Sequence, residues 1–242
     1  MRSSTLIRLF GVLAGLQFLF AVFAFVVLTA ADPIAHARIG MGLGLYLFWI
    51  MLGGMVMLAG RGPIATFVQT VRLGWRVKFV LFCTLLAMAE EAVAVAMTNA
   101  APLFGLKIGE AYITASANYW DVILGHSVIV FVPMFIAWAW LLGRYRFTPN
   151  QVFLLFGLTG TLAEATYGPQ HLLEIGMWMF VYGLMVYLPA YSVPQDRQGR
   201  DARWFHYPLA VVVPFLFLIL LLPVVPLLRL LRPSIETSFP GV

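Results

Sequence analysis

The sequence predicts an all-α fold, a polytopic integral membrane helix bundle with about seven transmembrane helices. Hydrophobic residues make up 62% of the 242 residues, charged residues 10%, and the mean hydropathy is +0.93. A soluble domain carries about 25% charged and 45–50% apolar residues. The composition therefore excludes a water-soluble globule, a disordered chain and a coiled coil. The single cysteine, Cys83, excludes a disulfide framework, a Cys-x-x-Cys zinc site and a cysteine-ligated iron–sulfur cluster.

Seven apolar stretches account for the predicted spans, because a bilayer core of about 30 Å requires about 20 apolar residues in a helix. The first follows a basic N-terminal stretch and is longer than the 7–15-residue core of a signal peptide, so we interpret it as a retained helix. The fifth is short, which favours a position inside protein rather than in lipid. The stretches are Leu9–Ala30, Ile39–Gly60, Phe79–Met97, Val122–Gly143, Val152–Tyr167, Leu172–Tyr191 and Leu209–Leu228.

The distribution of lysine and arginine predicts the orientation. With the N-terminus in the cytoplasm and the C-terminus outside, 11 of the 15 basic residues fall in inner segments and 4 in outer ones. This is a strong positive-inside bias. The loops therefore explain the net charge of +5 without a nucleic-acid partner. The inner set is Arg2, Arg8, Arg61, Arg72, Arg76, Lys78, Arg144, Arg146, Arg197, Arg200 and Arg203, and the outer set is Arg38, Lys107, Arg229 and Arg232.

The chain is expected to form one transmembrane helical domain over residues 1–242, because its longest connection, residues 98–121, has 24 residues. That connection is mostly small and apolar, which predicts an interfacial or re-entrant outer segment rather than a hydrated loop. Tyr112, Tyr119 and Trp120 suit the headgroup layer, where aromatic rings anchor membrane proteins.

Ionisable residues lie at one level in the predicted third to sixth spans, whereas the first, second and seventh have none. At 1.5 Å per residue, Glu90 and Glu91 lie about 9–11 Å below the outer boundary. The same rise places His126 about 8 Å deep, and Glu164 and Glu174 about 5 Å deep. Charged groups in lipid normally face the bundle interior and find partners. The sequence therefore predicts one shared polar pocket that opens toward the outer surface. The full set is Glu90, Glu91, Asp121, His126, Glu164, His171 and Glu174.

The adjacent glutamates cannot both point at one atom, because neighbours on a helix are about 100° apart. Two carboxyl groups that lie this close together and are shielded from water should not both be ionised, because burial and mutual repulsion raise the pKa of at least one. One of Glu90 and Glu91 is thus a candidate proton carrier or general acid, and Glu164 joins them as a candidate catalytic residue.

A divalent metal is a candidate cofactor, since zinc, iron and manganese accept imidazole together with carboxylate oxygen. The candidate ligands are His126, His171 and Glu164, with Glu90 or Glu91 in addition; no HExxH or ExxH signature accompanies them. A simpler interpretation makes His126 a neutral imidazole bonded to a nearby helix, His171 a cap on its turn, and Glu164 a protonated group in a helix contact.

The pair at 90–91, followed by His126, resembles the paired glutamate and first histidine of the CPBP intramembrane proteases. That family has an arginine four residues after the second glutamate, a phenylalanine four before the first histidine, and an asparagine four after the second histidine. Those positions hold Val95, Val122 and Ile175 in this chain. We therefore do not assign the chain to that family.

Three functions remain open. The first is a membrane-embedded enzyme that acts on a lipid-soluble substrate through the carboxylate and histidine pocket in the outer half of the bilayer. The second is a non-catalytic integral subunit of a larger membrane complex. The third is a proton-coupled carrier, which the dry inner half of the helices disfavours. The expected location is a bacterial or archaeal plasma membrane, with the lipid bilayer as the surrounding partner.

Overall fold

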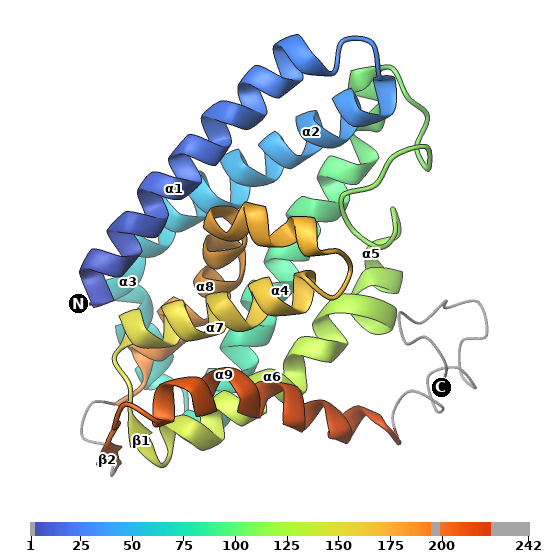
Figure 1. Ribbon diagram of the computed structural model, residues 1–242. Coiled ribbons are helices and arrows are strands. Elements are labelled where there is room, and N and C mark those ends of the chain that lie inside the picture. The colour runs from blue at the N-terminus through green and yellow to red at the C-terminus, as the bar shows by residue number, and fades with distance from the viewer. Residues whose placement is uncertain (1–2, 195–198, 224–242) are drawn as a thin grey trace.

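The computed structural model describes residues 3–194 and 199–223, and this part of the chain is a bundle of helices (Figure 1). Five helices in it are long and apolar enough to cross a membrane. The first is Ser3–Leu28, which consists of α1 (Ser3–Phe23) and a π-helical end, and the second is Pro33–Thr70, which consists of α2 (Pro33–Leu45), a π-helical stretch and α3 (Gly54–Thr70). The third is α4 (Trp75–Asn99). The fourth is Tyr119–Leu142, with α5 (Tyr119–Asp121), a π-helical turn and α6 (Ser127–Leu142), and the fifth is Pro169–Ser192, with a 3-10 turn and α8 (Ile175–Ser192).

Two further helices are shorter. Helix α7 (Pro149–Glu164) has 16 residues, which agrees with the expectation of a short fifth segment. The other is the apolar helix His206–Leu221, which contains α9 (His206–Leu216). The predicted seventh span, Leu209–Leu228, extends past residue 223 and so lies partly outside the described residues. The described part thus confirms a bundle of apolar helices, with five rather than seven of spanning length.

The second helix is longer than predicted. It continues from Pro33 to Thr70 and passes through Pro63 without ending, whereas the apolar stretch in the sequence ends near Gly60. Its start is well defined, because the Asp32 side chain accepts hydrogen bonds from the backbone N–H groups of Ile34 and Ala35. Figure 1 shows α1 and α2 side by side along one flank of the bundle.

A capping box starts α7. The Thr148 hydroxyl accepts a hydrogen bond from the Gln151 N–H at 3.3 Å, while the Gln151 side chain accepts one from the Thr148 N–H at 2.8 Å. Pro149 follows at the first helical position, where its missing N–H costs nothing. These contacts fix where α7 begins, and therefore the level at which Glu164 ends it.

Close packing holds α7 against α8 (Figure 1). Small residues let helix backbones approach one another in a membrane. A methyl group on Gly157 would lie 2.6 Å from the backbone oxygen of Met179, and one on Gly160 would overlap the ring of Tyr182. The glycines of α7 therefore bring Tyr182 into contact with the last turn of the helix.

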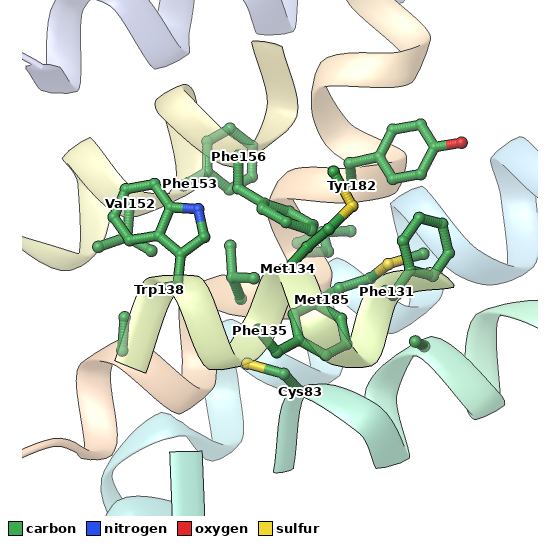
Figure 2. Packing of buried hydrophobic residues seen from close by; sticks show 14 of the residues in the cluster. Cys83, Phe131, Met134, Phe135, Trp138, Val152, Phe153, Phe156, Tyr182 and Met185 are labelled. Carbon is green, nitrogen blue, oxygen red and sulfur yellow. The ribbon is translucent and has the colours of Figure 1, made fainter. Parts of the chain in front are cut away.

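The core is centred on α6. Phe135 and Trp138 of α6 are completely buried, and Figure 2 shows them between side chains of α7 and α8 on one side and Cys83 of α4 on the other. The Phe135 ring lies 5.5 Å from that of Phe156, centroid to centroid. Helix α1, in contrast, leaves Leu16 and Phe20 more than half exposed, as expected for a lipid-facing helix.

Residues 100–118 fold back onto the end of α4. Gly105 and Gly109 adopt positive φ angles of 81° and 98°, which reverse the chain after a short 3-10 turn. The Asn99 side-chain amide donates to the backbone oxygen of Ala117 at 2.8 Å. This connection therefore covers the same end of α4 that carries Glu90 and Glu91.

A parallel pair of two-residue strands, β1 (Tyr145–Arg146) and β2 (Arg200–Asp201), lies just beyond the C-terminal end of α6. Apart from this pair, the regular structure in the described residues is helical.

Candidate functional site

Glu90 and Glu91 lie in the last third of α4 and are almost completely buried, with 5% and 6% of their surfaces exposed. Because the two residues are neighbours on a helix, their side chains point in different directions and have different partners. Glu91 accepts a hydrogen bond from the Thr114 hydroxyl of the outer connection at 3.1 Å, and another from the Ser127 side chain at the start of α6. Glu90 lies within electrostatic range of Tyr182 and Glu164. Glu91 therefore connects α4 to the outer connection and to α6, whereas Glu90 interacts with groups of α7 and α8.

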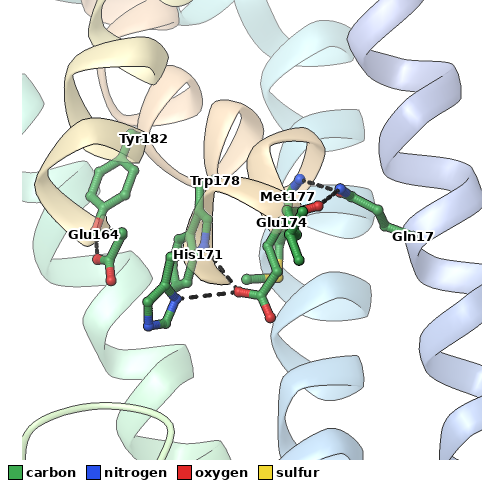
Figure 3. A network of polar contacts seen from close by, with 8 residues as sticks. Gln17, Glu164, His171, Glu174, Met177, Trp178 and Tyr182 are labelled. Atoms are coloured by element: carbon green, nitrogen blue, oxygen red, sulfur yellow. Dashed lines mark hydrogen bonds and ion pairs between the residues drawn. The ribbon is translucent and has the colours of Figure 1, made fainter. Parts of the chain in front are cut away.

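Glu164 is the last residue of α7, and its carboxylate accepts a hydrogen bond from the Tyr182 hydroxyl of α8 (Figure 3). Tyr182 has 6% of its surface exposed, and its ring packs against Phe131 and Trp178 with centroids 5.6 and 5.9 Å apart. The ring is thus held on both sides, so the hydroxyl orients Glu164.

The three carboxyl groups form one cluster. Glu90 interacts electrostatically with both Glu91 and Glu164, and Glu91 also interacts with Glu164. Among the described residues no lysine or arginine pairs with any of them. Three like charges within electrostatic range of one another repel, which disfavours the state in which all three carboxyl groups are ionised. Such an arrangement can both accept and donate protons.

His171 lies at the edge of this cluster. Its Nδ1 atom is 3.4 Å from Glu174 Oε2, which also accepts a hydrogen bond from the Trp178 indole at 3.1 Å (Figure 3). The imidazole is also within electrostatic range of Glu164. The side chain therefore pairs with a partly exposed carboxylate in the turn before α8.

The structure does not assemble the predicted metal ligands. His126 ends the π-helical turn before α6. Within residues 3–194 and 199–223 no group of three or more His, Cys, Asp or Glu side chains is placed to hold a metal ion. The physical reason is that the candidate oxygens and nitrogens have other neighbours. Glu164 receives Tyr182, and His171 faces Glu174. The described residues therefore do not support the set of His126, His171 and Glu164 as metal ligands, which stays a prediction.

The hydroxyl groups around the cluster, those of Thr114, Ser127 and Tyr182, were not predicted from the sequence. Serine and threonine are too common in turns and helix starts to stand out. Tyr182 does carry a signal, because a tyrosine in the middle of an apolar span needs a partner for its O–H group.

Gln17 of α1 joins the end of the bundle that carries the cluster (Figure 3). Its amide nitrogen donates to the Leu173 backbone oxygen at 2.6 Å, and its oxygen accepts from the Met177 N–H at 2.9 Å. Met177 lies in the first turn of α8, where backbone N–H groups have no partner within the helix. Gln17 therefore links α1 to the start of α8.

Comparison of the chain with protein-family models, with curated proteins and with solved structures finds no match.

Proposed function

We propose that this protein is a membrane-embedded enzyme that acts on a lipid-soluble substrate by acid–base chemistry at Glu90, Glu91 and Glu164. The observation that carries the proposal is that three carboxyl groups from α4 and α7 lie within electrostatic range of one another, two of them almost completely buried. Ionisable groups that converge inside a membrane bundle mark a functional site by default, because they are costly to keep there.

The role of each carboxyl group follows from its surroundings. A carboxyl group that keeps its proton can act as a general acid, and an ionised neighbour can act as a general base. Glu164 is only partly buried and is oriented by Tyr182, so it is the member of the cluster that a substrate reaches first. Glu90 and Glu91 are more deeply buried and exchange the proton with it. Removal of water from the site strengthens each of these interactions.

The test uses the protein in nanodiscs made from the total lipid extract of the cells that produce it. Lipids are compared by mass spectrometry before and after incubation, with the wild type, Glu90→Gln, Glu164→Gln and the matched control Glu174→Gln. We expect a lipid conversion that the wild type and the control catalyse and that both cluster variants abolish. A conversion that survives Glu164→Gln, or no conversion at all, contradicts the proposal.

Two other functions give different results in the same preparation. A proton-coupled carrier would give pH-driven flux in sealed vesicles that Glu90→Gln abolishes. A non-catalytic subunit would purify with a larger assembly and tolerate neutralisation of the cluster. Elemental analysis of the purified protein tests the metal-dependent variant of the enzyme, since one metal per chain would require ligands that the described residues do not assemble.

The proposal includes a topology of seven spans in a bacterial or archaeal plasma membrane, with the N-terminus in the cytoplasm and the C-terminus outside. The five long helices together with α7 and His206–Leu221 support that number, and the distribution of lysine and arginine supports the direction. Alkaline phosphatase fused to the C-terminus should be active, whereas a fluorescent protein fused there should be dark. The reverse result would require an even number of spans.

A further inference from the structure

An apolar groove lies at the other end of the bundle from the carboxyl cluster. It runs between the first half of α4 and the last half of α6 and has a volume of about 450 Å³. Its walls include Val77 and Leu81 of α4 and Ile136 and Trp140 of α6, and each of these side chains is between 36% and 51% exposed. An apolar, exposed groove on a membrane bundle is suited to a hydrocarbon chain.

Two arginines close one end of this groove. Arg76 belongs to the first turn of α4, and Arg144 follows the end of α6. The Arg144 guanidinium carbon lies 3.9 Å from the centroid of the Trp140 ring, and a methyl group added to Gly143 would lie 2.7 Å from the Arg76 guanidinium. Both positive groups therefore gather at the C-terminal end of α6.

Neither guanidinium group pairs with a carboxylate in the part of the chain that the structure describes. The cation–π contacts of Arg144 with Trp140 and of Arg76 with Trp75, together with the negative end of the α6 dipole, account for part of their placement. Among the described residues, most of the ten N–H donors of these two guanidinium groups have no hydrogen-bond partner. Arginine binds phosphate through paired hydrogen bonds, so the two groups together form a site for a phosphate-containing anion.

We propose that this groove binds one anionic phospholipid, with its phosphate headgroup on Arg76 and Arg144 and an acyl chain between α4 and α6. Charge complementarity selects this occupant, because the charged end and the apolar walls match the two parts of such a lipid. In the proposed topology this end faces the cytoplasm, where the leaflet carries the anionic lipids and where basic pockets between helices bind their headgroups. The proposal is independent of the chemistry at the carboxyl cluster.

The experiment measures lipid binding to the intact protein in mild detergent by native mass spectrometry. Phosphatidylglycerol and phosphatidylcholine with the same acyl chains are titrated separately. We expect one phosphatidylglycerol to bind per chain, and to bind at least about tenfold more tightly than phosphatidylcholine. Equal affinities would overturn the proposal, because the arginines would then not recognise the headgroup.

The variant Arg76→Gln/Arg144→Gln tests the headgroup site. Both side chains are exposed, so the fold should persist, and phosphatidylglycerol should bind about 10- to 30-fold more weakly. The matched control is Arg61→Gln/Arg72→Gln, which removes two positive charges from the same predicted side but none from the groove. The control should keep wild-type affinity. An equal loss in both variants would indicate a general effect of charge and refute the site.

Two further arms separate the sources of phosphate and test the groove. Inorganic phosphate at the same concentration should not displace the lipid, and displacement by phosphate alone would make this a free-anion site instead. Phosphatidylglycerol brominated on its acyl chains should quench tryptophan fluorescence, and Trp140→Phe should remove the greatest part of that quenching. Unchanged quenching in Trp140→Phe would place the acyl chain elsewhere and contradict the proposal.

Discussion

The contact between Tyr182 and Glu164 can be tested by the substitution Tyr182→Phe. This substitution removes the hydroxyl that donates to the Glu164 carboxylate and keeps the ring that packs against Phe131 and Trp178. The change therefore isolates one hydrogen bond, because the buried apolar area stays nearly the same. It also leaves a carboxyl group without the donor that orients it.

The expected loss in the free energy of unfolding is about 1–2 kcal/mol. Hydrogen bonds to charged groups contribute about 1.5–3 kcal/mol in soluble proteins, but bonds between membrane helices average about 0.6 kcal/mol with a maximum near 1.7. Tyr182 is buried and its acceptor is a carboxyl group, which puts this bond in the upper part of the membrane range.

Equilibrium unfolding in mixed micelles of a mild detergent and dodecyl sulfate, followed by circular dichroism, measures this loss. Tyr187→Phe is the matched control, since Tyr187 lies on the same helix and its hydroxyl has no hydrogen bond to a described residue. The control should change stability by less than about 0.5 kcal/mol. In a Glu164→Ala background the effect of Tyr182→Phe should fall by about 1 kcal/mol. Equal losses in Tyr182→Phe and Tyr187→Phe would refute the reasoning.

The same unfolding assay checks four other substitutions. Gly160→Ala should destabilise the protein by about 1–3 kcal/mol, because the added methyl group overlaps the Tyr182 ring, whereas Gly15→Ala should be neutral or stabilising because nothing lies within 4 Å of the new atom. Gln17→Leu should cost about 1–2 kcal/mol through the loss of two interhelical hydrogen bonds, and an unchanged midpoint would contradict that role. Trp138→Ala should cost about 3–5 kcal/mol, since this side chain is completely buried; a loss below about 1 kcal/mol would show that the core collapses around the gap.

Much of the fold could be predicted because length and hydropathy determine where a membrane helix can lie. Five of the predicted stretches correspond to helices of spanning length. The end of the second could not be predicted from hydropathy, because backbone hydrogen bonds carry that helix through Pro63 and beyond its apolar part. The length of α7 depends on the capping box at Thr148 and on packing against α8, which a window of average hydropathy does not register.

The carboxyl cluster could be predicted in part for a similar reason. Depth along each helix follows from residue number, so the common level of Glu90, Glu91 and Glu164 is visible in the sequence. The rotation of each helix about its own axis is not visible in the sequence, because it depends on how the helices pack. The glycines of α7 turn Glu164 toward Tyr182, while His171 faces Glu174 in the turn before α8. The predicted metal ligands are not grouped in the described residues for this reason, because a common level does not make side chains converge on one point.

The packing between the two ends of α4 bears on the choice between an enzyme and a carrier. Arg76 and Glu90 are 14 residues apart, about 21 Å along the helix. The middle of the bundle between these levels is filled by Cys83, Phe135 and Trp138, all without exposed surface (Figure 2). Protons taken up at the carboxyl cluster would have to cross this apolar layer to reach the other side, and water or a polar chain is needed for that. An enzyme that takes its substrate from the outer leaflet requires no such route, so the closed core favours chemistry at the cluster over transport through it.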